Sequence, residues 1–534
     1  MKFQSYAAGQ NHFQVDSDLQ AILDAYWPEW KRFQSDLDSF GQFVGNEVME
    51  AAYHIDHDAP PTLIMHDLDG NRVDRVRLSP AQQAILPRLA SVNRPPHEGG
   101  NWHHHFALGY LIADPGLYCI VTITGQTIYA IKKYAPEHED WVEKMLSGEA
   151  FGATWMTEVQ GGSDLGANTA SARFDGEVWR LSGDKYFTSG AGLTDLALVT
   201  ARPEGAAGGP KGLALFLVPR LNLGGDLNYH VRRLKDKSAT RAVPSGEAEF
   251  ADAEAYLVGA VHEGIYYTLE NLTVSRLANA VAAMGIAKKA HLEVLGRVVN
   301  RETFGKRLVE HPLIRRDLVD LSVRMVAGTA LAFHAVDAFD KAWRERPPYS
   351  PAYHYARFLS HLAKNRTANH AAHITGTAME LFGGLGFLEE YAVARWHREA
   401  LITPIWEGPS NIQALDMLEA MQKKQAHEPF LADFLPLLER AGTDAARLAA
   451  ETMKRTVQHL ASLKSPEEAQ WYAKRALTTL ADAAQVGLLY KLAETGGPRY
   501  AHMADLYATH FLLHEEYPAS ALDLKIVWGA GLDA

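Results

Sequence analysis

The sequence predicts an α+β protein in which an all-β segment lies between two mainly helical parts. The chain has 534 residues, of which 47% are apolar and 22% are charged. That composition is typical of a soluble globular protein, and the length predicts about three or four structural units. The pattern changes twice along the chain. Helical periodicity gives way to short apolar runs near residue 151, and it returns near residue 263.

The first part, residues 17–150, is predicted to be mainly helical with one interruption. Leu68–Val73 contains an Asp-Gly pair flanked by alternating residues, which predicts a β-hairpin. The aspartates in this segment resemble part of a calcium loop. However, Arg72 stands where that loop requires a glycine, and Leu78 stands where it requires a bidentate glutamate. We therefore expect a hairpin without calcium.

The middle part, residues 151–262, is predicted to be a β domain. Val178–Leu181, Leu196–Val199 and Leu213–Val218 are short apolar runs bounded by glycine or proline, which is a pattern typical of strands. Gly205–Gly212 is rich in glycine and alanine and predicts a loop between two of these strands. The strands together predict one all-β insert between the helical parts.

Helical periodicity resumes after the β segment. Gly264–Asn300 predicts one long helix. Pro312 is expected to open the next helix, because proline is favoured in the first helical turn. The glycines at positions 383, 384 and 386 predict the end of a further helix.

The last part, residues 428–534, is predicted to be a helical extension. Three helices are expected between Pro429 and Glu516, with breaks near Lys464–Pro466 and Thr495–Pro498. This part has ten Lys and Arg residues against fourteen Asp and Glu residues, and the whole chain has a net charge of −12. Because Lys and Arg contacts to phosphates dominate DNA affinity, we expect no nucleic-acid partner.

Other features argue against several classes of site and location. With one cysteine, Cys119, no intrachain disulfide can form and a thiol-based metal site is not expected. Residues 1–6 lack the apolar core of a signal peptide, and the sequence has no run of about 18 apolar residues. We therefore expect a cytoplasmic protein that does not bind a membrane. His103–His105 would point in directions about 100° apart on a helix, so we expect no metal site there.

Four separated segments combine glycines with polar or aromatic residues. Each alone also fits a structural role, such as a polar loop, a core strand, a basic helix end or a helix-capping glutamate. The segments are Thr157–Asp164, Gly183–Ser189, Arg301–Leu308 and Pro404–Asn411. A dinucleotide fingerprint is not among them, because Gly384–Gly386 lacks the third glycine and follows a helix instead of a strand. A Walker loop is absent from the sequence.

Glu407 is the strongest candidate for chemistry. It lies between Trp406 and Gly408, where a helix is about to restart. One reading is that it stabilises the helix N-terminus through the helix dipole. In the other reading, dry surroundings make its carboxylate a base that can remove a weakly acidic proton from carbon. Trp406 would supply part of such surroundings.

Taken together, these segments and Phe382–Phe387 resemble the flavin and general-base motifs of the acyl-CoA dehydrogenase family. The resemblance covers residues 20–425. Within it, Thr157–Asp164, Arg233–Lys237 and Ile405–Gly408 look like the AidB-like branch. It implies FAD as the cofactor. It also implies an N-terminal helical domain, a central β-barrel or sandwich, a C-terminal four-helix bundle and an extra helical extension. Their expected bounds are 1–150, 151–262, 263–427 and 428–534.

The resemblance further implies which residues hold FAD. Phe187 takes the position of an aromatic that stacks on the flavin, and Ser189 that of a hydroxyl at the reactive N5. Arg301 would meet the pyrophosphate and Phe304 would pack near the adenine, both in the FAD site of a neighbouring subunit. The expected FAD-binding residues are Thr157, Gly162, Ser163, Phe187, Ser189, Arg301, Phe304, Gly383, Gly384 and Asn411.

By the same resemblance, Glu407 is the catalytic residue of an acyl-CoA dehydrogenase of fatty acid metabolism. It would remove the α-proton of an acyl-CoA thioester while the β-hydrogen leaves as hydride to FAD. Arg276 matches an arginine near the base and would organise the pocket. The expected substrate-contacting residues are Ser163, Arg276, Trp406 and Gly408.

The resemblance implies partners as well. Shared FAD sites imply a homodimer or, as the preferred expectation, a homotetramer, and an electron-transfer flavoprotein would be the acceptor. A second hypothesis is an AidB-like flavoprotein of alkylation stress that binds DNA through a basic C-terminal region, which the acidic residues 428–534 disfavour. A third is a flavin oxidase or monooxygenase on the same fold. Retention of Glu407 favours dehydrogenation.

Overall fold

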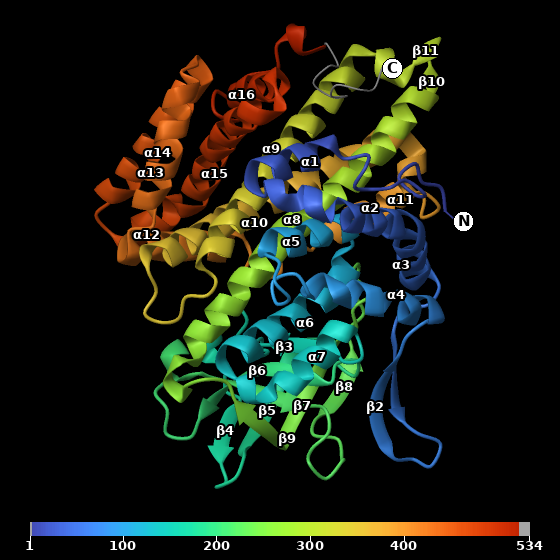
Figure 1. The fold of residues 1–534 in the computed structure, drawn as a ribbon, viewed down its shortest axis with the longest axis vertical. Coiled ribbons are helices and arrows are strands. Elements are labelled where there is room, and N and C mark those ends of the chain that lie inside the picture. Colours follow the sequence, from blue (N-terminus) through green and yellow to red (C-terminus); the bar gives the residue numbers. More distant parts are fainter. Residues whose placement is uncertain (1–2, 523–534) are drawn as a thin grey trace. The chain divides into compact units, whose positions relative to one another are not determined.

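The computed structural model describes residues 3–522, and the chain divides into two compact units (Figure 1). The first unit consists of Met1–Met49, Asn101–Ala113 and Arg276–Ala534, and the second consists of Glu50–Gly100 and Asp114–Ser275. The boundary after Ser275 falls inside helix α8 (Gly264–Asn300). This helix has the bounds that the sequence predicted.

The second unit is built on a mixed β-sheet. Among the described residues its strands are β3 (Gly152–Trp155), β4 (Ser171–Phe174), β5 (Trp179–Ser189), β6 (Leu196–Pro203), β7 (Ala214–Pro219), β8 (His230–Leu234) and β9 (Ser245–Leu257). They pair in the order β3–β6–β4–β5–β9–β7, β8 lies beside β9, and β6 also pairs with β7. The β6–β7 pairing closes a circuit, so these strands form a barrel. The predicted α+β class is confirmed.

The predicted strands are confirmed, and two of the predicted stretches belong to one strand. β5 begins within the predicted Val178–Leu181 but continues to Ser189. Gly183, the first residue of the predicted strand Gly183–Ser189, lies in a bulge where the register of β5 against β9 shifts. The strand therefore continues through the glycine, and it carries Phe187 and Ser189.

The predicted N-terminal hairpin is also confirmed. β1 (Thr62–His66) pairs antiparallel with β2 (Arg72–Arg77). The Asp67 carboxylate accepts hydrogen bonds from the backbone N–H groups of Asp69 and Asn71, at 2.9 and 2.8 Å. These bonds close the turn.

The second unit also contains helices, and α6 packs against the barrel strands. The helices are α3 (Met49–His57), α4 (Pro80–Ala90), α6 (Pro115–Tyr134) and α7 (Glu139–Ser147), and Figure 1 shows α6 and α7 in front of β3 and β6. The buried residues shared by α6, α7 and the strands include Ile128, Ile131, Met145, Leu196, Leu198 and Leu215. Trp155, Phe216 and Phe250 belong to a second buried cluster formed mostly by strand residues. The second cluster also contains Leu181, so the strand that carries Phe187 is part of a packed scaffold.

The first unit is mainly helical. Besides the rest of α8, its longer elements are α1 (Ser17–Tyr26), α2 (Gln34–Phe43), α5 (Trp102–Ile112), α9 (Pro312–Ala342), α10 (Pro351–Phe382), α11 (Ala392–Ala400) and α12 (Ser410–Lys424). A short hairpin of β10 (Glu302–Thr303) and β11 (Lys306–Arg307) follows α8. Pro312 opens α9 as predicted. α10 ends at Phe382 as predicted, because Gly383 follows with φ +64°.

The C-terminal extension contains one more helix than the three predicted, within the residues that the structure describes. Its helices are α13 (His427–Ala441), α14 (Asp444–Ser462), α15 (Pro466–Gly496) and α16 (Pro498–Phe511). The missed break lies at Gly442, with φ +64°, followed by Thr443, whose side chain caps α14 by accepting the N–H of Ala446. The sequence therefore contained this signal.

The extension packs against the bundle of the first unit. α15 contacts α9, α10 and α12. Arg366 of α10 donates from Nε to Oδ1 of Asp482 on α15 at 2.5 Å, and Tyr507 of α16 donates to the same oxygen at 2.7 Å. All three side chains are buried, so the extension forms part of the folded core of this unit.

α9 is the one helix in the described part of the chain that is long and apolar enough to cross a membrane. Its most apolar 18-residue window has a mean hydropathy of 1.3, and 94% of that window is buried inside the protein. Burial of this extent is a property of a core helix, which passes the same test of length and composition.

Candidate functional site

The candidate residues fall into two groups, one in each unit. The group in the second unit comprises Thr157, Gly162, Ser163, Phe187 and Ser189. The group in the first unit comprises Arg276, Arg301, Phe304, Gly383, Gly384, Trp406, Glu407, Gly408 and Asn411.

The loop after β3 and the end of β5 lie together in the second unit. The backbone N–H of Tyr186 donates to the carbonyl oxygen of Thr157 at 2.9 Å. Gly162 lies against Thr157, because a Cβ added to it would come within 3.2 Å of the Thr157 Cγ2 atom. The Phe187 side chain is 53% exposed, and the Ser189 hydroxyl lies 3.3 Å from that of Ser245.

A buried ion pair between Glu158 and Lys185, which was not predicted from the sequence, fixes this loop. Glu158 Oε1 lies 2.8 Å from Lys185 Nζ, and Oε2 accepts the backbone N–H of Thr169 at 2.7 Å. Burial opposes the charge of Glu158, but Lys185 and the backbone N–H groups of Thr169 and Ala170 together outweigh it and hold the pKa of Glu158 below its usual value. Burial also lowers the pKa of Lys185 to about 8. Glu158 therefore acts inside the β domain as an anchor of the loop.

A second cation lies beside the exposed end of β5. Lys235 Nζ is 3.3 Å from the ring centroid of Tyr186 and 4.6 Å from that of Phe187. It also lies 2.8 Å from a carboxylate oxygen of Glu247. The Arg233–Lys237 motif thus contributes a cation that packs against the aromatic residues of this strand.

In the first unit, Trp406–Gly408 forms a tight turn before α12. Glu407 has φ +57° and Gly408 has φ +92°. The left-handed conformation costs a residue with a side chain about 1 kcal/mol, so neighbouring groups must stabilise it. The Trp406 indole N–H donates a short hydrogen bond to Oδ1 of Asn279, which lies one helical turn after Arg276 on α8.

Hydrogen bonds from three helices hold the two carbonyl groups of this turn. The oxygen of Glu407 accepts from Arg276 Nε at 3.2 Å and from Gln413 Nε2 at 2.8 Å. The oxygen of Gly408 accepts from Gln413 Nε2 at 2.9 Å and from Lys364 Nζ at 2.8 Å. Arg276 therefore lies near Glu407. Gln413 and Lys364 were not among the residues that the sequence singled out.

Arg276 and α10 complete the surroundings of the turn. The Arg276 guanidinium lies 2.9 Å from the Asp416 carboxylate, and His361 Nδ1 lies 2.9 Å from Gln413 Oε1. Burial, reinforced by Arg276, lowers the pKa of His361 to about 3, so its imidazole is neutral. A neutral imidazole protonated on Nδ1 can donate to Gln413 and orient its amide.

The remaining candidates of this unit lie on its exposed parts. Phe304, with φ +50°, stands at the tip of the β10–β11 hairpin and is 98% exposed. Arg301 precedes this hairpin, and Asn411 lies in the first turn of α12. Both are exposed. A Cβ added to Gly383 or Gly384 would meet nothing within 4 Å.

The three consecutive histidines lie in three different surroundings on α5. His103 lies 3.4 Å from an oxygen of Asp337, and the rings of His104 and His105 pack against Trp27 and Trp102, respectively. The described residues contain no cluster of three or more His, Cys, Asp or Glu residues suited to a metal ion.

Family models match most of the chain. The model of the adaptive response protein AidB N-terminal domain matches residues 4–150. Those of the acyl-CoA dehydrogenase middle and C-terminal domains match residues 153–253 and 262–422.

Individual proteins give the same result. AidB of Escherichia coli (strain K12) is 30% identical over 432 residues, which cover 76% of this chain and 77% of that protein. The 3-methylmercaptopropionyl-CoA dehydrogenase of Ruegeria pomeroyi is 33% identical over 303 residues, which cover 52% of this chain and 51% of that enzyme. The structure of Caenorhabditis elegans ACDH-11 in complex with C11-CoA matches with a TM-score of 0.84 and 23% identity. That match covers 100% of this chain and 97% of that one, and it shows a shared fold.

The residues in both units fit FAD, the cofactor of this family. In the second unit, the half-exposed ring of Phe187 offers a stacking surface, and the hydroxyls of Thr157, Ser163 and Ser189 offer partners for a polar ring edge. In the first unit, the open backbone at Gly383 and Gly384 leaves room for a large ligand. The chain therefore belongs to the acyl-CoA dehydrogenase family, in its AidB-like branch, and is an FAD-dependent oxidoreductase.

Proposed function

We propose that this protein catalyses the α,β-dehydrogenation of an acyl-CoA thioester with Glu407 as the base. The observation that carries the proposal is the turn at Glu407. Glu407 has a strained conformation, and the turn is held by hydrogen bonds from Arg276 and Gln413 to the oxygen of Glu407 and from Lys364 to that of Gly408. Strain that is stabilised in this way is concentrated at functional sites. The relative from Ruegeria pomeroyi is named for an acyl-CoA substrate, and the Caenorhabditis elegans structure holds C11-CoA.

In the proposed reaction, the Glu407 carboxylate takes the α-proton, and the electrons of that C–H bond form the new α,β double bond. Bound FAD supplies the acceptor for the β-hydrogen and its electron pair. Trp406, the neighbouring residue in the turn, would exclude water on one side of the carboxylate. The backbone N–H of Glu407 would hold the thioester oxygen and stabilise the charge that develops there.

The test is Glu407→Gln, which keeps the shape of the side chain and removes the base. The variant should retain FAD and bind acyl-CoA, yet its flavin should be reduced at least about a hundredfold more slowly, since one positioned base contributes typically 10²–10⁴-fold. Anaerobic stopped-flow absorbance with a panel of acyl-CoAs first finds the substrate and then measures the rate. Flavin reduction at the wild-type rate in this variant would refute the proposal.

We further propose a cytoplasmic homotetramer that acts in fatty acid metabolism and passes its electrons to an electron-transfer flavoprotein. The exposed Phe304 and Arg301 support the assembly, because an almost fully exposed phenylalanine at a hairpin tip suits an intersubunit contact. Light scattering of the FAD-loaded protein tests this, and a fully active monomer would contradict it.

Tight duplex DNA binding is not part of the proposed function. The extension from residue 428 on has four more acidic than basic residues, and three of its charged residues, Asp523, Lys525 and Asp533, lie outside the described residues. Without a cationic excess, phosphate neutralisation is weak. Fluorescence anisotropy at physiological salt should detect no tight complex, and sub-micromolar affinity that depends on residues 428–534 would overturn this view.

A further inference from the structure

We propose that Lys364, together with Gln413 and Arg276, forms a clamp that positions Glu407 for proton removal. In this inference, Lys364 is a positioning residue: it acts on the base through the carbonyl oxygen of Gly408. The inference rests on the proposed function, because it assigns a role in the reaction of Glu407.

The clamp acts on the conformation of the turn. Glu407 and Gly408 both have positive φ values, and the oxygens of both accept the hydrogen bonds described above. With both carbonyl groups fixed, the peptide planes on the C-terminal side of Glu407 cannot rotate. The direction of its side chain is then set by the clamp, which is the requirement for a base that must meet one particular proton.

Helix α10 presents a row of polar side chains to this turn. His361, Lys364 and Asn365 lie three and four residues apart, so they share one face of the helix. They contact Gln413, the carbonyl of Gly408 and the hydroxyl of Ser410, respectively. All three side chains of α10 are buried. One face of α10 therefore contacts the turn and the start of α12 at three points.

Burying the charged side chain of Lys364 costs free energy that a purely structural role would not require. Its side chain is buried, and its ammonium group donates to an uncharged backbone oxygen. Burial lowers the pKa of Lys364 to about 7, while the charge of Glu407 favours the protonated form and that of Arg276 opposes it. An apolar side chain would fill the same space without the cost of burying charge. A function of Lys364 in holding the turn and placing a positive charge near the base accounts for this cost of burial.

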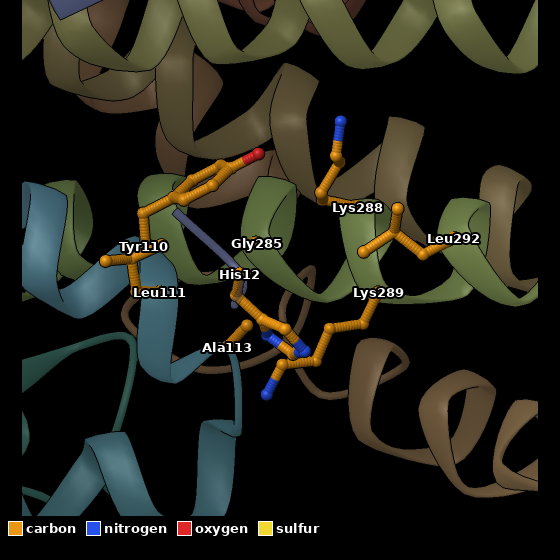
Figure 2. A pocket seen from close by; sticks show the side chains of 8 residues that line it. All are labelled: His12, Tyr110, Leu111, Ala113, Gly285, Lys288, Lys289 and Leu292. Carbon is orange, nitrogen blue, oxygen red and sulfur yellow. The ribbon is translucent and has the colours of Figure 1, made fainter. Parts of the chain in front are cut away.

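Lys289 provides a matched control in the same unit. It is buried and donates from Nζ to the carbonyl oxygen of Ile112 at 2.6 Å. Figure 2 shows it beside a small cavity, together with His12, Tyr110, Ala113 and Lys288. Lys289 lies 13 residues beyond Arg276 on α8, which corresponds to about 20 Å along the helix. Lys289→Met therefore removes a similar hydrogen bond far from the turn.

The experiment compares Lys364→Met, Lys364→Arg and Lys289→Met in the FAD-loaded protein. The main readout is exchange of the α-protons with deuterated solvent in a 3-thia-acyl-CoA, which has sulfur at the β position and therefore no β-hydrogen to donate. Mass spectrometry measures this exchange without any change in the flavin. FAD content, the dissociation constant of the analogue and the midpoint of thermal unfolding are measured alongside.

We expect Lys364→Met to slow the exchange at least about tenfold, because a small misplacement of a reacting group has a large effect on rate. The dissociation constant should change less than threefold or so. Lys364→Arg, which keeps a charged donor, should recover most of the rate, and Lys289→Met should exchange at about the wild-type rate. Wild-type exchange in Lys364→Met, or equal slowing in Lys289→Met, would overturn the inference.

If Lys364→Met does not fold, Gln413→Met replaces it, because Gln413 is the other donor to the Gly408 carbonyl. Slow exchange in that folded variant supports the clamp, and normal exchange overturns it. Glu407→Gln distinguishes failure of the proposed base from failure of the clamp. Normal exchange in Glu407→Gln refutes the proposed base, whereas slow exchange there with normal exchange in Lys364→Met refutes the clamp alone.

Discussion

Each unit of the molecule uses a buried lysine to hold a segment of the candidate site, but the two lysines bind different groups. In the second unit, Lys185 pairs with the carboxylate of Glu158 and so fixes the loop that carries Thr157. In the first unit, Lys364 donates to the backbone oxygen of Gly408 and so fixes the turn that carries Glu407. Lys185 is thus paired with a carboxylate of opposite charge, whereas Lys364 donates to an uncharged carbonyl oxygen.

This difference indicates a structural role for Lys185 and a role beside the proposed base for Lys364. In the second unit, a carboxylate is occupied in holding the loop, and Glu158 sits inside the barrel domain. In the first unit, the hydrogen bond goes to the backbone, so holding the turn does not require the carboxylate of Glu407. The comparison predicts that changes at Lys185 mainly reduce stability, and that changes around Lys364 mainly reduce the rate of proton removal.

The largest expected effect is that of Lys185→Met on stability. Removing one member of a buried ion pair leaves the other charge uncompensated, which typically costs about 3–5 kcal/mol. Urea unfolding followed by circular dichroism should show this loss, and FAD content should fall because the loop is released. The double variant Glu158→Leu/Lys185→Met should recover much of the stability. A double variant no more stable than Lys185→Met would show that the ion pair is not what fixes the loop.

Much of the fold could be predicted because its boundaries are local signals. Pro312 and Gly383 begin and end helices through their own backbone preferences, and both positions were predicted. The two predicted strand stretches on either side of Ser182 form the single strand β5, and the bulged pairing with β9 that joins them at Gly183 could not be predicted because it depends on a distant part of the chain. The break at Gly442 was missed although its glycine and the capping Thr443 carry a local signal.

Candidate site residues could be identified from the sequence only where the side chain itself would bind the cofactor or react. Glu407, Trp406 and Phe187 could be singled out from residue type and neighbours, and their assigned roles stay predictions. Lys364 and Gln413 could not be singled out, because their importance depends on their contacts with Gly408. Lys364 lies 44 residues from Gly408 along the chain, and Gln413 lies 5 residues from it. The polar residues His361, Lys364 and Asn365, spaced to share one face of a helix, are the one sign that the sequence offers.

A second prediction compares one glycine from each site segment. A Cβ added to Gly408, where φ is +92°, would come within 2.7 Å of Nε2 of Gln413, whereas at Gly162 it would come within 3.2 Å of Thr157 Cγ2. Gly408→Ala therefore strains the backbone and displaces a clamp residue. We expect it to cost about 1–3 kcal/mol of stability and to slow flavin reduction more than tenfold or so.

Gly162→Ala is the matched variant for this prediction. Its Cβ requires a shift of only a few tenths of an ångström from the Thr157 methyl group, so we expect a smaller loss of stability than in Gly408→Ala. Unfolding curves and stopped-flow reduction of both proteins provide the comparison. Equal effects in the two variants would contradict the special role of the turn.

The last prediction uses pH to separate the two lysines. Burial lowers the pKa of Lys364 to about 7 and that of Lys185 to about 8, and an unfolded lysine has a pKa of about 10.4. Between the two values, the unfolded chain binds more protons than the folded one, so each lysine makes the free energy of unfolding rise with pH by up to about 1.4 kcal/mol per pH unit. Methionine at either position removes that rise.

The difference in stability between the wild type and Lys364→Met should therefore begin to move in favour of the wild type from about pH 7, and that for Lys185→Met from about pH 8. Urea titrations from pH 6 to about 10 measure both differences, and parallel pH curves for the wild type and Lys364→Met would mean that Lys364 is not a charged group buried against the turn.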